Sequence, residues 1–248
     1  MTRKSVFYTN LIIEEADIPR AEAALGAKGI EKHIIIKEKL RAWNNEVDVE
    51  YTKIASTYRY DKRLRFILFK YISYLEEHYR SILLDEYASN SESYDLIKYI
   101  NEKLTSNGNL NNVLEDINFS LLIRQIQELP DSLKEAHSIR SNIHSKSNFK
   151  ALITLRNAVM HNKFLLLYRG YDKCYVQGVD NSRSANLKAN ILNLIEFLPE
   201  DVGIRCRDEI NLCSQDRNKE NDTKWDLPPA VVVKLDDEEF KGKSANCI

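Results

Sequence analysis

The chain has 248 residues, of which 43% are hydrophobic and 29% charged, enough to bury a core in one large domain or one domain with extensions. The formal net charge of −1 excludes a uniformly basic nucleic-acid-binding protein, so any nucleic-acid contact must come from a local patch. Only 7 Gly and 5 Pro interrupt the sequence, which favours long helices over many short strands.

The sequence shows neither a metal-binding nor a membrane signature. Its four cysteines form no C-x-x-C pair and have no histidine at zinc-ligand spacing, which is typical of free thiols in a reducing cytoplasm. No apolar run approaches the ~18 residues of a membrane-spanning helix, and the N-terminus does not resemble a signal peptide. We therefore expect a cytoplasmic protein with no metal, no cofactor and no membrane partner.

Helical patterns follow one another along the chain. The longest covers 60–88, where apolar residues recur at three-and-four spacing behind Asp61 as N-cap, and 49–58 predicts a separate short helix or connector. The run 162–184 is ambiguous, because it fits either an extension of the preceding helix or a short strand or hairpin. Other helices are predicted over 17–30, 31–47, 94–105, 113–129, 131–144, 147–163, 184–199 and 204–221.

These patterns predict an all-α fold in three parts. Residues 1–57 form an N-terminal helical extension, 58–215 a helical domain, and 216–248 a polar, acid-rich C-terminal arm. Within the arm, the apolar island AVVVKL at 230–235 is interpreted as either a strand or a segment that docks on a partner.

The run ITLRNAVMHNKFLLLYRG, residues 153–170, places polar side chains in an apolar helical pattern. Asn157 and His161 are four residues apart and share a helix face, and Arg156 lies one step round. An arginine fork fits phosphate oxygens, and a histidine titrates near neutrality and transfers protons. This set fits metal-free cleavage of RNA by the 2′-hydroxyl. The spacing also leaves a structural role open, in which Arg156 pairs with an acid such as Glu76 and His161 caps the helix.

The local charge around this motif supports contact with RNA. Between residues 138 and 173, seven basic residues face one acid, Asp172, which gives a local net charge of +6. The seven basic residues are Arg140, Lys146, Lys150, Arg156, Lys163, Arg169 and Lys173.

Two motifs carry a family resemblance. The segment LRNAVMHN contains an R-(polar)-x-x-x-H pattern, and about 90 residues upstream a Y-x-F-D-x-x-L-R opening is matched, with Tyr at the Phe position, by Tyr58, Tyr60, Asp61, Leu64 and Arg65. A mid-helix glutamate, Glu76, follows this opening. In this order the motifs resemble the HEPN ribonuclease superfamily, and within it the Abi-like (abortive infection, AbiD/AbiF-type) branch.

The resemblance implies a HEPN-like helical bundle that acts as a homodimer and cleaves single-stranded RNA without metal. It implies His161 as general acid and base, Arg156 as ligand of the scissile phosphate and Asn157 as the polar residue beside it. Asp61 and Glu76 would support the same cleft. It also suggests a toxin of bacterial phage defence, and a small non-coding RNA as partner. The candidate RNA-binding residues are Arg65, Lys150, Lys163 and Arg169.

Two other functions remain open from the sequence. In the first, the chain is a non-catalytic RNA-binding module that holds a structured RNA through Arg156 and the basic strip, while His161 only packs. In the second, it is a regulatory protein whose acidic tail contacts a partner.

Overall fold

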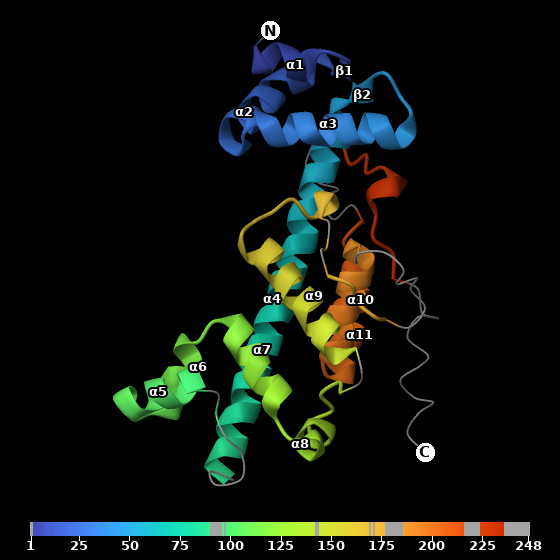
Figure 1. Ribbon diagram of the computed structural model, residues 1–248. Helices are drawn as coiled ribbons and strands as arrows, with labels where there is room; N and C mark the ends of the chain where they lie inside the picture. Colours follow the sequence, from blue (N-terminus) through green and yellow to red (C-terminus); the bar gives the residue numbers. More distant parts are fainter. Residues whose placement is uncertain are drawn as a thin grey trace. The chain divides into compact units, whose positions relative to one another are not determined.

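The computed structural model describes residues 2–89, 96, 98–141, 144–168, 170, 172–176, 186–215 and 224–235. This described part contains eleven α-helices and a single pair of two-residue strands (Figure 1), which confirms the predicted all-α class. None of the helices so described is long and apolar enough to cross a bilayer.

The chain divides into two compact units. The first comprises Met1–Leu64 and Ile210–Val233, and the second comprises Arg65–Glu209 and Lys234–Ile248. The division falls inside two helices, α4 (Tyr51–Ser89) and α11 (Glu200–Leu212). The boundaries of these units therefore differ from those of the predicted segments 1–57, 58–215 and 216–248.

The first unit is built around short helices and one strand pair. Strand β1 (Leu11–Ile12) pairs in parallel with β2 (Val49–Glu50). The other elements between residues 3 and 44 are α1 (Arg3–Tyr8), η1 (Glu15–Asp17), α2 (Ile18–Lys28) and α3 (Ile30–Asn44). Fully buried apolar residues of this unit include Phe7, Ala21, Ile36, Leu40 and Ile54.

The C-terminal segment 224–233 packs within the first unit. The Trp225 ring lies under two guanidiniums, those of Arg59 at 5.3 Å and Arg63 at 4.5 Å from its centre. The backbone N–H of Val233 donates to the hydroxyl of the buried Tyr60 at 2.8 Å. The first two residues of the predicted apolar island, 230 and 231, belong to a short 3-10 helix, η3 (Pro229–Val231), in place of a strand.

Helix α4 begins at Tyr51, so the predicted separate element in 49–58 and the predicted N-cap at Asp61 are wrong. No Gly or Pro interrupts this stretch. The buried residues Ile54 and Leu64 continue one apolar face across the expected break. Asp61 lies inside the helix and is fully buried.

The second unit packs helices around the remainder of α4 (Figure 1). Helix α9 (Ser145–Met160) contacts α7 (Phe119–Glu128) and α10 (Leu187–Phe197). The rings of Phe149 and Phe197 stack between α9 and α10 with centres 4.4 Å apart. The other elements of this unit are α5 (Lys98–Asn107), α6 (Leu110–Asp116), α8 (Asp131–Ala136), η2 (Leu165–Leu167) and most of α11.

Between residues 113 and 184, three predicted elements differ from the structure, and beyond them the helix predicted over 204–221 is α11 (Glu200–Leu212). The single helix over 113–129 is two helices, because the side chain of Asn118 accepts the N–H of Leu121 at 3.1 Å and starts α7. The helix over 131–144 ends at Ala136, and Ser138 follows with φ +53°. In the ambiguous run, 163–168, 170 and 172–176 contain η2 and no strand, while 169, 171 and 177–185 lie outside the described residues.

A buried lysine closes the C-terminal end of α1. The side chain of Lys37 on α3 is 1% exposed, and its Nζ donates to the carbonyls of Val6 at 2.7 Å, Phe7 at 3.0 Å and Thr9 at 2.6 Å. The last carbonyls of a helix have no partner inside it and carry the negative end of its dipole. Burial lowers the pKa of Lys37, while the nearby Glu38 opposes this shift. The ammonium therefore joins α1 to α3.

Replacing Lys37 with Met is expected to lower the free energy of unfolding by about 2–3 kcal/mol, because three carbonyls lose a charged donor in a buried place. Urea unfolding monitored by circular dichroism measures this loss. The matched control, Lys32→Met, removes an exposed lysine from the same helix and should change stability by less than about 0.5 kcal/mol. Equal stability of both variants would contradict the capping role.

Candidate active site on helix α9

Apolar packing and one asparagine hold α9 in place. Leu152 and Leu155 are fully buried on the face that meets its neighbouring helices. In its first turn, the Asn148 side chain accepts the N–H of Tyr175 at 2.7 Å and donates to the Tyr175 carbonyl at 3.0 Å. The Asn193 side chain donates to the carbonyl of Asn148 at 2.8 Å. These contacts fix the helix that carries the predicted motif.

Helix α9 ends in a Schellman turn. The N–H of Asn162 donates to the carbonyl of Val159 at 3.1 Å, and the N–H of Lys163 donates to that of Ala158 at 2.9 Å. Asn162 adopts the left-handed conformation with φ +53°, which asparagine tolerates better than most residues. His161 is the C-cap residue of this turn, and it is exposed.

The guanidinium of Arg156 is half-buried beside α4 and α7. Its Nη2 lies 3.4 Å from Oε1 of Glu76, and the two side chains are 25% and 12% exposed. Its carbon Cζ lies 5.7 Å from the centre of the Phe119 ring. The structure thus confirms the predicted contact between Arg156 and Glu76. The ion pair uses one of the five N–H donors of the guanidinium.

A second guanidinium shares the same carboxylate. Nη2 of Arg80 lies 3.7 Å from Oε1 of Glu76, one helical turn away on α4. Arg80 also donates to the carbonyls of Leu114 at 2.8 Å and Ile117 at 3.3 Å. Because arginine keeps its charge, Arg80, Arg156 and Glu76 together carry a net charge of +1.

The solvent side of α9 presents four polar residues in line. Their separations of four, seven and four residues place them on one face of the helix. The lysines and the histidine are exposed and the asparagine is half-buried, over roughly 20 Å of helix axis at ~1.5 Å per residue. The members of this α9 stripe are Lys146, Lys150, Asn157 and His161.

The other predicted site residues lie in several places. Lys163 is exposed in the turn after His161, and Arg65 is half-buried on α4. Asp61 is fully buried and belongs to the first unit, whereas Arg156 and Glu76 belong to the second. Arg169 lies outside the described residues.

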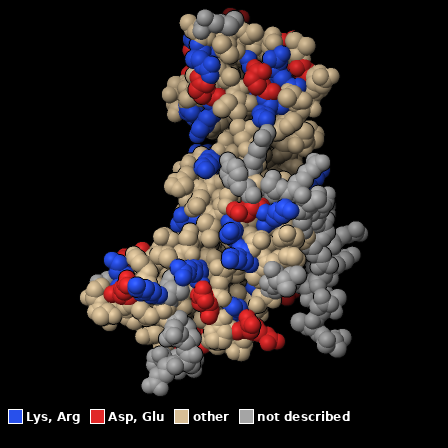
Figure 2. Space-filling model, viewed as in Figure 1, with Lys and Arg blue, Asp and Glu red and all other residues tan. Residues whose placement is uncertain are grey.

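The basic strip over 138–173 is partly neutralised within the second unit. Arg140 forms an ion pair with Glu196 and donates to the Tyr175 carbonyl at 2.7 Å. Asp172 accepts the hydroxyl of Thr154 on α9 at 3.0 Å. On the face drawn in Figure 2, basic and acidic side chains lie interspersed among uncharged ones. Among those residues of the strip that the structure describes, the exposed charges are those of Lys146, Lys150, Lys163 and Lys173.

Two residues that contact predicted site residues were not found from the sequence, Arg80 beside Glu76 and Phe119 beside Arg156. Arg80 follows Glu76 by four residues on a predicted helix, a spacing that indicates an ion pair. Phe119 gave no such signal, because its ring reaches Arg156 only through the packing of α7 on α9.

Comparison with known proteins adds no relative to these observations. No family model, curated protein or solved structure matches the chain. Within the described ranges, no group of three or more His, Cys, Asp and Glu side chains is arranged to hold a metal ion. The possible chemistry of the α9 stripe and of the Arg156–Glu76 pair therefore follows from the positions and contacts of their side chains.

Replacing Glu76 with Gln is expected to lower the free energy of unfolding by about 1–3 kcal/mol, because two half-buried guanidiniums lose their shared carboxylate. Chemical denaturation of the full chain measures the loss. Glu77→Gln is the matched control, since Glu77 is exposed on the same helix. A Glu76 variant as stable as the control would rule out the carboxylate as a structural anchor.

Proposed function

We propose that this protein is a metal-independent endoribonuclease of the Abi-like HEPN type, which cleaves single-stranded RNA. The observation that supports it best is the exposed imidazole of His161 at the end of α9, in the same R-x4-H motif as Arg156. A rigid turn presents this imidazole to solvent, and an imidazole can accept or donate a proton near neutral pH.

In the proposed reaction, one imidazole removes the proton of the 2′-hydroxyl as its oxygen forms a bond to phosphorus. The bond from phosphorus to the 5′-oxygen breaks, and a second acid protonates that leaving oxygen. The products are a 2′,3′-cyclic phosphate and a 5′-hydroxyl, so no water or cofactor is consumed. The guanidinium of Arg156 stabilises the charge that builds on the phosphate oxygens.

This reaction requires a base and an acid at opposite sides of one phosphate. Each chain provides one imidazole at the end of α9, that of His161. A homodimer in which two such helix ends face each other supplies both groups, and we propose this arrangement for the active enzyme. The positive charge left over at Arg80, Arg156 and Glu76 favours a phosphate beside these side chains.

The lysines of the α9 stripe extend the proposed site along the RNA backbone. Lys146 and Lys150 are exposed on the same helix face as His161. Lysine contacts to phosphates bind RNA without choosing its sequence. On the strength of the family resemblance, we propose that the protein is a toxin that damages RNA during phage defence, and its cysteine pattern favours the cytoplasm.

Replacing His161 with Ala is expected to reduce RNA cleavage at least 100-fold, because proton transfer is lost while the backbone turn remains. The assay incubates the purified chain with end-labelled single-stranded RNA in EDTA and detects 2′,3′-cyclic phosphate ends. His78→Ala is the control, since His78 is a half-buried histidine on α4 of the same unit. Cleavage by the His161 variant at the wild-type rate would refute the nuclease proposal.

A second proposal is a non-catalytic RNA-binding module that holds a small structured RNA. It is favoured by one observation: Glu76 already engages Arg156, while the lysines of the α9 stripe are open to solvent. On this proposal the lysines carry the affinity, and the wild-type chain leaves the labelled RNA intact in the same assay.

Under both proposals, the double variant Lys146→Gln, Lys150→Gln should bind RNA more weakly and with a smaller salt dependence. Each lost phosphate contact lowers the slope of log affinity against log salt by about 0.7–0.9. Electrophoretic mobility shifts over a salt series measure this slope. Lys98→Gln with Lys103→Gln removes the same charge from exposed positions on α5 and should leave it unchanged. Equal slopes for the two double variants would exclude the α9 stripe as the RNA contact.

A further inference from the structure

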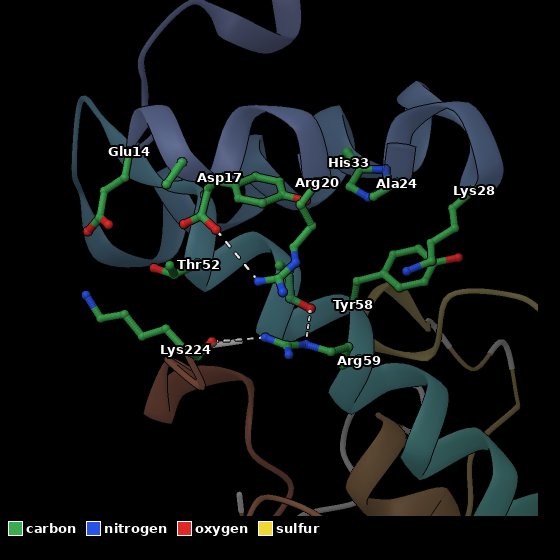
Figure 3. A pocket seen from close by; sticks show the side chains of 13 residues that line it. Glu14, Asp17, Arg20, Ala24, Lys28, His33, Thr52, Tyr58, Arg59 and Lys224 are labelled. Carbon is green, nitrogen blue, oxygen red and sulfur yellow. Dashed lines mark hydrogen bonds and ion pairs between the residues drawn. The ribbon is translucent and has the colours of Figure 1, made fainter. Parts of the chain in front are cut away.

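A cavity of about 410 Å³ lies within the first unit, between α2, η1 and the first turns of α4 (Figure 3). Its volume falls in the range of small-molecule sites. It shares no residue with the α9 stripe or with the Arg156–Glu76 pair. Its chemistry has therefore to be explained separately from the proposed nuclease site.

The lining of this cavity has an excess of positive charge. Four cationic side chains face two carboxylates, those of Glu14 and Asp17. The four cations and two carboxylates of the lining carry a net charge of +2. One guanidinium nitrogen of Arg20 lies 3.7 Å from a carboxylate oxygen of Asp17. The four cations are Arg20, Lys28, Arg59 and Lys224.

The surroundings of Lys28 show the same excess. Burial lowers the pKa of its ammonium, and the positive charges of Lys62 and Arg59 lower it further. The charges of Lys62 and Arg59 thus disfavour the charged form of Lys28. A bound anion would remove this repulsion.

Two arginines approach the centre of the cavity from different helices. In Figure 3, Arg20 extends from α2 and Arg59 from α4 toward the same space. The Arg59 guanidinium is held by the carbonyls of Ala55 at 3.2 Å and Lys224 at 3.1 Å and by the hydroxyl of Ser56 at 3.1 Å. These contacts use the Nε and Nη2 donors of Arg59, so its positive charge is fixed beside the cavity and attracts an oxyanion without further loss of side-chain entropy.

Another part of the cavity wall consists of aromatic rings and short side chains. The Tyr58 ring lies parallel to His33, with an interplanar angle of 4° and ring centres 5.3 Å apart, and the Lys28 ammonium lies 5.1 Å from its centre. Ala24 and Ala55 line the same space, and their short side chains leave room for a flat group. The cavity thus offers a cationic part and a flat aromatic part side by side.

From this pairing we infer that the cavity binds a free nucleoside 5′-monophosphate, with its phosphate between Arg20 and Arg59 and its base along the Tyr58 wall. The phosphate matches the positive charge of the two guanidiniums, and the base matches the aromatic and alanine lining. This binding does not depend on RNA cleavage by the α9 site.

The inference is tested by isothermal titration of the full chain with each of the four common nucleoside 5′-monophosphates. At least one should bind with Kd below about 1 mM, and the matching nucleoside and inorganic phosphate should each bind at least tenfold more weakly. If none of the four binds, or if inorganic phosphate alone binds as tightly, the inference is overturned.

Variants locate the binding in this cavity. Arg20→Gln should raise Kd about tenfold or more, because a charge-assisted bond to phosphate is lost. Ala24→Phe keeps every charge and fills the space, so it should abolish binding. Lys32→Gln, at an exposed position on α3 outside the lining, is the charge control and should bind as the wild type. Circular dichroism checks the fold of each variant. Wild-type Kd values for both Arg20→Gln and Ala24→Phe would overturn the assignment.

His161→Ala separates this inference from the nuclease proposal. The variant should bind the nucleotide with the wild-type Kd, because His161 is not part of the cavity lining. Loss of nucleotide binding in this variant would mean that the ligand occupies the α9 site, and it would overturn the inference.

Discussion

One half-buried carboxylate, that of Glu76, joins three parts of the second unit. It engages Arg156 on α9 and Arg80 on its own helix, and Arg80 also donates to the carbonyls of Leu114 and Ile117 at the link between α6 and α7. A carboxylate in such a place is tolerated only when cations and hydrogen bonds offset its desolvation. In addition to the apolar packing and the contacts of Asn148, this group therefore connects α4 to α9, the helix that carries His161 as its C-cap.

The same contact has two opposite effects on Arg156. It fixes the guanidinium in one orientation, which favours a reaction that needs a phosphate ligand in place beforehand. It also supplies a carboxylate that competes with phosphate for the donors of the guanidinium. The two proposed functions differ in which effect dominates. In the proposed nuclease, an RNA phosphate accepts hydrogen bonds from the remaining donors of Arg156. In the proposed binding module, the exposed lysines bind the RNA phosphates instead.

The helices could be predicted from the sequence because their apolar spacing is regular and Gly and Pro are scarce, as in α4 and α10. The break before α7 had a local signal, the capping side chain of Asn118, although a single helix was predicted over 113–129. Other features had no local signal. The partners of Lys37 are backbone carbonyls 28 to 31 positions away, and the nucleotide cavity joins Arg20 to Lys224. Only the tertiary structure brings such groups together.

The first unit combines residues 2–64 with residues 210–215 and 224–233, which delays its completion during biosynthesis. The side chains of Thr52 and Asp226, 174 positions apart, meet at 3.1 Å, and Tyr60 accepts a hydrogen bond from Val233. A ribosome that adds about 5–20 residues per second makes the later partners roughly 10–35 s after the earlier ones. Until then, Arg59 and Arg63 lack the Trp225 ring that covers them. Residues 65–209 of the second unit are therefore made before the first unit can be completed, and any translation product that stops before Trp225 lacks part of the first unit.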